Sequence, residues 1–316
     1  MHKLIRFWNQ NRNPIIKFLA IIIFIFIVLQ VINGFAKSKN QKKLNEISNL
    51  TNTTTVKSAT DTDESKGLVS NKSAVTGQSL SKGQLQSATD IIYNFVNYCN
   101  QQELDKAYDL LTDECKQEIY TTLEVFKNAY YQNIFNGQKR NCTIENWVGD
   151  TYRVKIAEDM LATGKDTGYS KEDYITIKEV NGESKLNINN YIGYKSIDKT
   201  TSKENISINV VSKNIYKEYE EYTIKVTNNT DGNIQLDTTT STNTLYLEDS
   251  KGMKYYYYNH ELTDPSLTIV TGQTKEVKIK FYSNYVSTKD IRYIVFSNLI
   301  LKNGQITEKI DFRANV

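Results

Sequence analysis

The sequence predicts a multidomain protein in which an N-terminal transmembrane helix precedes an α+β domain and an all-β sandwich. Three patterns predict this fold class: an apolar run near the start, apolar residues at helical spacing after residue 87, and period-two alternation from residue 142 onward. The expected segments are a basic cytoplasmic tail at 1–14, the membrane helix at 15–36, a disordered stalk at 37–86, the α+β domain at 87–197 and the sandwich at 205–316.

The apolar run extends from Ile15 to Ala36, a stretch of 22 residues in which Lys17 is the only charged residue. A transmembrane helix needs about 20 mostly apolar residues, and a lysine near its end can reach the interface. We therefore expect a single-pass anchor with a cytoplasmic N-terminus, because a first apolar segment usually directs export. The basic start and the Gly34-Phe35-Ala36 pattern also fit a cleavable secretory signal, so a secreted protein stays an alternative.

Charge is distributed unevenly along the chain. Residues 1–86 hold 12 Lys/Arg against four Asp/Glu, whereas residues 87–316 hold 27 against 32, a net charge of −5. Nucleic-acid binding needs a basic face on a folded domain, so this class of function is excluded. The stretch 37–86 has no aromatic residue and is dominated by Ser, Thr, Asn, Lys and Gly. Such a composition buries little apolar area, which predicts a disordered stalk.

Three helical runs followed by strands predict the α+β domain. The first two begin near residues 87 and 103, and the third extends from Asp113 to about Phe135 with apolar residues three or four apart. After residue 137 the period becomes two, and Asn181-Gly182 is a strong hairpin turn signal. The expected strands are Cys142–Val148, Thr151–Asp159, Asp173–Val180 and Lys185–Ser196.

The helix and strand order, together with the phrase LDKAYDLLTDECKQ, resembles exported members of the nuclear-transport-factor-2-like superfamily over residues 87–197. The resemblance implies a cone-shaped α+β fold with a concave pocket. It transfers no catalytic residue, because this domain contains no histidine; the two histidines of the chain are His2 and His260. Five aromatic residues are candidates to line the pocket, with ordinary core packing as the alternative: Tyr93, Tyr130, Trp147, Tyr152 and Tyr191.

The C-terminal part predicts strands only. A polar joint at 198–204 precedes about eight short alternating segments, separated by turn signals such as Asp231-Gly232, which predicts a sandwich. The phrases YTIKVTNNTDGNI and LYLEDSKGMKYYY, followed by a Thr-Gly-Gln turn before KEVKIKFY, resemble the telokin-like, immunoglobulin-like domain of Gram-positive surface proteins. The resemblance implies a sandwich and an exported location, and it implies no activity.

Four consecutive tyrosines, residues 255–258, are the most conspicuous feature of this part. Alternate side chains on a strand point to opposite faces, so one pair should pack inside and the other should face outward. Tyr255 and Tyr257 are the candidate contact surface for a sugar or a protein. Ordinary packing on an outer strand is the alternative interpretation.

Three cysteines lie in the α+β region, where a pair could form a disulfide or all could be small buried apolar residues: Cys99, Cys115 and Cys142. No domain holds a Ser/His/Asp or Cys/His set, a phosphate-binding glycine loop or a metal-ligand spacing. We therefore expect a non-catalytic protein without cofactor or metal.

The predicted function is that of a membrane-anchored extracytoplasmic protein that binds or scaffolds at a Gram-positive cell surface. Its partners would be the membrane and an envelope protein or polysaccharide. One alternative is a structural subunit of an envelope assembly for secretion, conjugation or cell-wall synthesis. A sensor of a small ligand is a further alternative.

Overall fold

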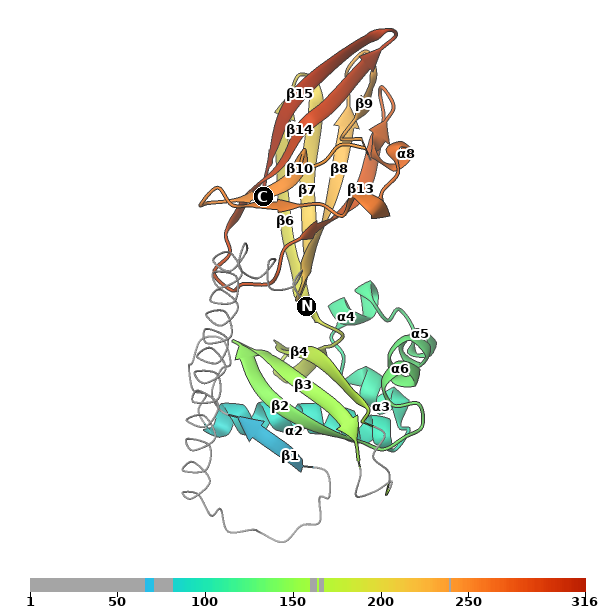
Figure 1. Ribbon diagram of the computed structural model, residues 1–316, viewed down its shortest axis with the longest axis vertical. Helices are drawn as coiled ribbons and strands as arrows, with labels where there is room; N and C mark the ends of the chain where they lie inside the picture. Colours follow the sequence, from blue (N-terminus) through green and yellow to red (C-terminus); the bar gives the residue numbers. More distant parts are fainter. Residues whose placement is uncertain (1–65, 71–81, 160–163, 165–167, 239) are drawn as a thin grey trace, which may run out of the picture. The chain divides into compact units, whose positions relative to one another are not determined.

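The computed structural model of the chain describes residues 66–70, 82–159, 164, 168–238 and 240–316 (Figure 1). The predicted tail and anchor at 1–36, and most of the predicted stalk, lie outside these residues. Within the part that is described, no helix is long and apolar enough to cross a membrane. All of the described residues belong to one compact unit.

The expected fold class was wrong. Residues 85–316 are 51% strand and 21% helix, and their strands form three antiparallel sheets. The third helical run is not one long helix, because the chain leaves the helical path between Tyr120 and Thr122. A strand also runs through the predicted joint at 198–204, so no linker divides the two predicted domains. The described residues form a mainly β structure, with one 19-residue helix and several shorter ones packed on the first sheet.

The first sheet has the strand order β1-β2-β3-β4-β5. Its strands are β1 (Lys66–Ser70), β2 (Arg140–Val148), β3 (Thr151–Glu158), β4 (Ser170–Val180) and β5 (Glu183–Asn187). The helices that accompany it are α2 (Lys82–Asn100), α3 (Leu104–Asp109), α4 (Asp113–Glu118), α5 (Leu123–Phe126), η1 (Lys127–Tyr131) and α6 (Gln132–Ile134). Strand β1 and the start of α2 fall inside the predicted stalk, and β1 pairs with β2 in parallel.

Threonine caps explain why the third helical run forms two helical segments, one beginning at Asp113 and one at Leu123. The side chain of Thr112 accepts a hydrogen bond from the Cys115 N–H at 3.0 Å, and the side chain of Thr122 accepts one from the Val125 N–H at 3.2 Å. Each cap satisfies a backbone N–H that has no partner in the first turn of a helix. The break between the two helices leaves Tyr120 fully buried in the same core as the apolar stripe.

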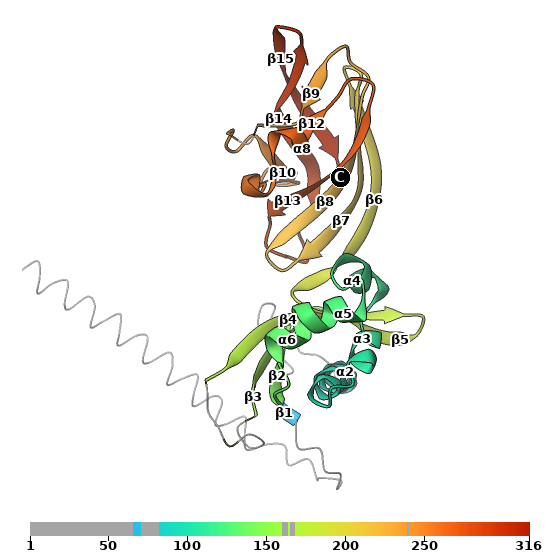
Figure 2. The same cartoon turned by 90° about the vertical axis from the view of Figure 1, so that its right-hand side faces the viewer.

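Two further sheets face each other across a second hydrophobic core (Figure 2). One has the order β13-β8-β7-β6. Its strands are β6 (Tyr191–Lys203), β7 (Ile206–Tyr216), β8 (Tyr219–Asn228) and β13 (Thr274–Tyr282).

The sheet that faces it has the order β11-β10-β14-β9-β12, with β15 also paired to β14. Its strands are β9 (Asn233–Gln235), β10 (Leu245–Asp249), β11 (Lys254–Tyr256), β12 (Thr268–Ile269), β14 (Ile291–Asn303) and β15 (Ile306–Asn315). Two short helices, η2 (Asn259–Glu261) and α8 (Asp264–Leu267), lie between β11 and β12.

The predicted strand Lys185–Ser196 is interrupted by Asn189 and Asn190. Both have positive φ angles, +60° and +63°, which asparagine tolerates better than most residues. The buried carboxylate of Asp173 accepts hydrogen bonds from their backbone N–H groups at 3.0 and 2.9 Å. Strand β6 begins directly afterwards, with Tyr191 in the first core, and continues into the second pair of sheets.

Candidate functional site

The five residues predicted to line an aromatic pocket in the α+β region lie in different surroundings. Four of the five are buried in the first hydrophobic core: Tyr93, Tyr130, Tyr152 and Tyr191. The fifth, Trp147, is half-buried, with its ring centre 4.8 Å from that of Tyr174. The four buried tyrosines pack in the first core, which is the core-packing alternative, and Tyr191 also borders the smaller hollow described below. Trp147 lies outside that core, against Tyr174 and Tyr285.

The two residues of the predicted contact surface, Tyr255 and Tyr257, pack in or against the second core. Tyr257 is only 5% exposed and belongs to the second core, while Tyr255 is half-buried and donates a hydrogen bond to Asp249 Oδ2 at 3.3 Å. Side chains alternate between the two faces along residues 255–258, as expected. Hydrogen bonding of this segment to β10 and β13 decides which two tyrosines point inward. Tyr256 is exposed, and Tyr258 stacks on Tyr282 with ring centres 3.4 Å apart.

The three cysteines are free and buried, so none of them forms a disulfide in this structure. Burial raises the pKa of the Cys115 and Cys142 thiols to about 12 each. A thiol in this state is a poor nucleophile at neutral pH. The cysteines therefore act as small apolar side chains.

Tyrosines cross one end of the sheet β13-β8-β7-β6 in a continuous row. Strand register places Tyr191 opposite Tyr216, and Tyr219 opposite Tyr282. Tyr216 and Tyr219 flank a two-residue turn, and their rings stack with centres 4.3 Å apart. We call these four residues the tyrosine row. It was missed because its members come from four strands; the segment IYKEYEEY, which places a tyrosine at each end of a turn, was the local signal.

Helix α4 packs against the outer face of this sheet near the tyrosine row. Glu118, its last residue, accepts a hydrogen bond from the Tyr216 hydroxyl at 3.4 Å and pairs with Lys278 of β13 at 3.6 Å. Glu114, one turn earlier, accepts hydrogen bonds from Asn187 Nδ2 at 2.6 Å and from the Tyr194 backbone N–H at 3.3 Å. These contacts fix the acidic side of α4 over the start of β6.

Two hollows share Glu118 as a wall, and we call them together the Glu118 groove. The larger has a volume of about 400 Å³, and its lining includes Asn189, Asn190, Tyr216, Glu218 and Tyr219. The smaller has a volume of about 220 Å³, and its lining includes Glu114, Tyr191, Tyr194, Ser212, Asn214 and Lys278. Tyrosine rings, carboxylates, amides and a hydroxyl therefore converge on one groove.

A β-bulge places two polar side chains in the smaller hollow. Ile208 and Val210 of β7 point into the second core, but the pairing with β8 shifts by one residue between Val210 and Ser212. After the shift, Ser212 and Asn214 face the outer side, where strict alternation would have predicted the core. Both residues are at least 90% buried.

Each of these two side chains retains an unused hydrogen-bonding group. Asn214 Oδ1 accepts from the Tyr191 hydroxyl at 2.9 Å, but its Nδ2 has no partner among the described residues. The same holds for the Ser212 hydroxyl within the part of the chain that the structure describes. Neither atom is among the fully buried, unpaired polar atoms of the described residues, so both are open to the hollow, where a ligand can supply the missing hydrogen bonds.

The groove is acidic. Lys278 is shared by two carboxylates, because its Nζ lies 3.6 Å from Glu118 Oε2 and 3.6 Å from Glu221 Oε1. Burial raises the pKa of Glu221, and Glu118 raises it further, whereas Lys278 lowers it. The larger hollow is lined by two carboxylates, and none of its described lining residues is Lys or Arg.

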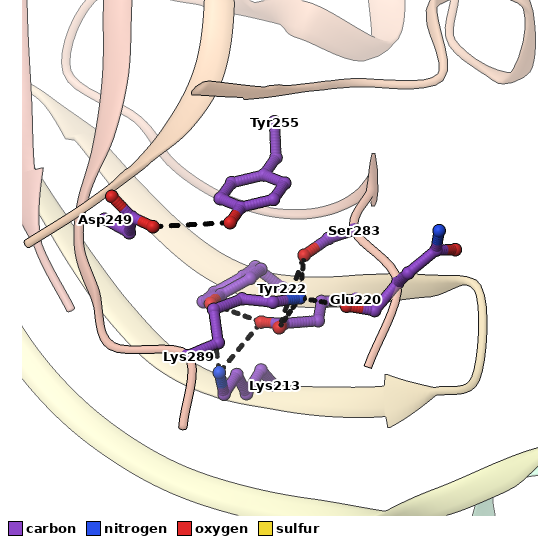
Figure 3. A network of polar contacts seen from close by, with 8 residues as sticks. Lys213, Glu220, Tyr222, Asp249, Tyr255, Ser283 and Lys289 are labelled. Carbon is purple, nitrogen blue, oxygen red and sulfur yellow. Dashed lines mark hydrogen bonds and ion pairs between the residues drawn. The ribbon is translucent and has the colours of Figure 1, made fainter. Parts of the chain in front are cut away.

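A separate charged cluster lies on the inner side of the same sheet (Figure 3). The buried carboxylate of Glu220 pairs with Lys213 at 2.8 Å and Lys289 at 3.2 Å, and it accepts a hydrogen bond from the Tyr222 hydroxyl at 2.8 Å. Lys289 also donates to Ser283 Oγ and to the Asn284 carbonyl. Because these charges are paired inside the protein, the cluster holds the loop after β13 in place and offers no open site.

The pKa values of this cluster follow from its geometry. Burial by itself raises the pKa of Glu220, but Lys213 and Lys289 outweigh burial and hold it below its usual range. Burial lowers the pKa of Lys289, although Glu220 opposes this effect. The carboxylate is therefore ionised at neutral pH, with two buried lysines as its counter-ions.

Comparison of the chain with protein-family models, with curated proteins and with solved structures gave no match. Among the residues that the structure describes, no group of three or more His, Cys, Asp or Glu is arranged to hold a metal ion. The Glu118 groove is the feature of the described residues whose chemistry points to a ligand.

Proposed function

We propose that this chain is a non-catalytic, membrane-anchored protein of a bacterial cell surface that binds a saccharide in the Glu118 groove. The observation that carries the proposal is the pair of unpaired hydrogen-bonding groups that Ser212 and Asn214, two largely buried residues, present to the smaller hollow beside Tyr191 and Tyr194. A sugar ring has an apolar face of C–H groups and a rim of hydroxyls. It therefore complements a site that combines aromatic rings with buried donors and acceptors.

The dimensions of the groove support an end group or a short segment of a polysaccharide. The smaller hollow, at about 220 Å³, is below the range of about 300–1,000 Å³ typical of sites for drug-sized ligands. Tyr194 stands at this hollow with 49% of its surface exposed, so its ring is available to a ligand. Open grooves of this kind suit an extended polymer better than a fully enclosed small molecule.

The anchor and the extracytoplasmic location rest on the sequence. Residues 15–36 have the length and apolarity of a single membrane span, with the cytoplasmic side at the N-terminus. An anchored protein that binds an envelope polysaccharide links the membrane to the wall without any chemical step. The resemblance to exported surface domains supports the same location.

The test is isothermal titration calorimetry of the full-length protein in detergent micelles with a panel of oligosaccharides. The panel includes oligomers of glucose, mannose, galactose, N-acetylglucosamine and glucosamine. We expect at least one oligomer to bind, and Tyr194→Ala to weaken its binding about tenfold, because an aromatic contact contributes about 0.5–1.5 kcal/mol.

Tyr256→Ala is the matched control for this experiment. Tyr256 is also exposed, but it lies on β11 of the opposite sheet, so its replacement should leave the affinity unchanged. If no oligomer binds, or if Tyr194→Ala binds as tightly as the wild type, the saccharide proposal is wrong.

A further inference from the structure

We infer that the saccharide bound in the Glu118 groove carries a free amino group, whose ammonium is held between Glu118 and the tyrosine row. This inference rests on the proposed function, and it narrows the ligand to an amino sugar that is not acetylated. It makes neutral and anionic polymers the weaker ligands of the same groove.

The charge balance around Glu118 is the first argument. Glu118 and Glu221 are 20% and 11% exposed at their side chains, and both lie 3.6 Å from the Lys278 ammonium. Lys280 also acts on Glu221, but its ammonium is paired with Glu261 at 2.9 Å. Two carboxylates that share one lysine leave a partly buried negative charge uncompensated. An ammonium group at Glu118 would give each carboxylate its own cation and form charge-assisted hydrogen bonds.

The remaining charges nearby do not reverse this balance. Glu218 pairs with Lys217 at 3.7 Å, and the Lys217 ammonium lies over the Tyr174 ring, 4.0 Å from its centre. Lys178 approaches the same region beside Gly193, opposite Glu114. With these lysines and the Lys280–Glu261 pair included, five carboxylates (Glu114, Glu118, Glu218, Glu221 and Glu261) face four lysines, so one negative charge stays in excess.

The walls of the larger hollow are the second argument. Tyr216 and Tyr219 form one wall and Glu118 and Glu218 supply the charge, which is the combination that binds ammonium groups through cation–π and ionic contacts. The Tyr219 ring already has the Lys280 ammonium 5.4 Å from its centre. The ring system at this end of the sheet is therefore compatible with a cation.

The third argument is independent of charge. The Ser212 hydroxyl and Asn214 Nδ2, described above, border the smaller hollow and have no partner within the described residues. They give the groove hydrogen-bonding groups for a ligand in addition to a charge for a counter-ion. A sugar with its hydroxyls at Ser212 and Asn214 and its amine at Glu118 would use both hollows together.

The test compares glucosamine tetramer with N-acetylglucosamine tetramer, using the full-length protein in detergent micelles at pH 6. The two probes differ in whether the nitrogen carries a charge or an acetyl group. We expect the glucosamine tetramer to bind about tenfold more tightly, and this preference to shrink at high salt because the contact is ionic. Glu118→Gln should abolish the preference.

Two further variants complete the design. Glu218→Gln, whose side chain is 68% exposed and therefore tolerant of substitution, should reduce the preference without affecting the fold. Glu276→Gln is the matched control, because Glu276 lies on the same sheet but pairs with Lys225 outside the groove. This control should bind both tetramers as the wild type does.

The outcomes separate the two proposals. If the acetylated tetramer, or a neutral oligomer of the panel, binds as tightly as the glucosamine tetramer, the amino-sugar inference is wrong and saccharide binding stands. If both Glu118→Gln and Glu218→Gln keep the full preference, the site of the amine is wrong. If no saccharide binds at all, the proposed function fails and the inference fails with it.

Discussion

Replacing Glu220 by glutamine tests whether the charged cluster stabilises the sheets around the second core. The substitution keeps the shape of the side chain and removes its charge. It leaves Lys289 and Lys213, whose side chains are only 5% and 12% exposed, without their shared counter-ion. Breaking a buried ion pair in this way costs about 3–5 kcal/mol, a large share of the 5–15 kcal/mol typical of a folded domain.

An upper limit for this cost follows from the chemistry of lysine. A lysine that loses its counter-ion can release its proton instead, which from a pKa of about 10.4 costs about 4.6 kcal/mol at pH 7 and about 1.9 kcal/mol at pH 9. We therefore expect Glu220→Gln to lower the free energy of unfolding by about 4 kcal/mol at pH 7. The loss should fall to about 2 kcal/mol at pH 9.

The sign of this pH dependence can be stated for each group. In the variant, the pKa of Lys289 is lower in the folded than in the unfolded state, so the folded state binds fewer protons and gains stability as pH rises toward 10.4. In the wild type, the pKa of Glu220 is held below its usual value. Its contribution is therefore present above a pH of about 4.3 and is lost as the pH falls through the lower folded pKa.

The assay is urea unfolding of the full-length protein in non-ionic detergent, followed by near-ultraviolet circular dichroism of the tyrosines. Glu276→Gln is the control, because its pair with Lys225 is 54% exposed on both sides and should contribute less than about 1 kcal/mol. Adding Lys289→Met to Glu220→Gln should restore part of the loss. A loss below about 1 kcal/mol at pH 7, or one that grows with pH, would refute the reasoning.

Two other predictions concern the first core. Asp173→Ala should lower the free energy of unfolding by about 3 kcal/mol, because it removes the acceptor for the Tyr130 hydroxyl and for two backbone N–H groups just before β6. Urea unfolding followed by tryptophan fluorescence measures this loss of stability, with the exposed Glu172→Ala as the control. An equal loss in both variants would contradict the prediction. The three buried thiols should resist a maleimide reagent in the folded protein and should all react in urea, as mass spectrometry of the labelled protein would count. Rapid labelling of the native protein would show that the cysteines are exposed, and fewer than three labels in urea would show that some are paired.

Local pattern predicted three of the five strands of the first sheet closely. The segments expected at 142–148, 151–159 and 173–180 became β2, β3 and β4 with shifts of at most three residues. The Asn181-Gly182 signal became the turn between β4 and β5, with φ angles of +54° and +83°. Alternation and turn residues depend on neighbours in sequence, so they can be recognised without knowledge of the fold.

Patterns that depend on distant partners were not predictable in the same way. The helical spacing before Phe135 did not reveal the break after Tyr120, because that break is stabilised by a threonine cap and by burial of the tyrosine. The polar residues 198–204 suggested a joint, yet most of them belong to β6, where pairing with β7 satisfies their backbone groups. A strand whose exposed residues are polar looks the same in the sequence as a polar loop.

The sequence by itself determined the apolar segment at 15–36, the acidic balance of residues 87–316, the period of most strands and the tyrosine-rich composition. Only the tertiary structure decided which tyrosines meet, which pair of residues 255–258 is buried, and that Ser212 and Asn214 share a groove with Glu118. The groove arises because a bulge in β7 turns two polar side chains outward and α4 packs over them. Both are consequences of pairing between segments far apart in the chain, which leave no mark on local periodicity.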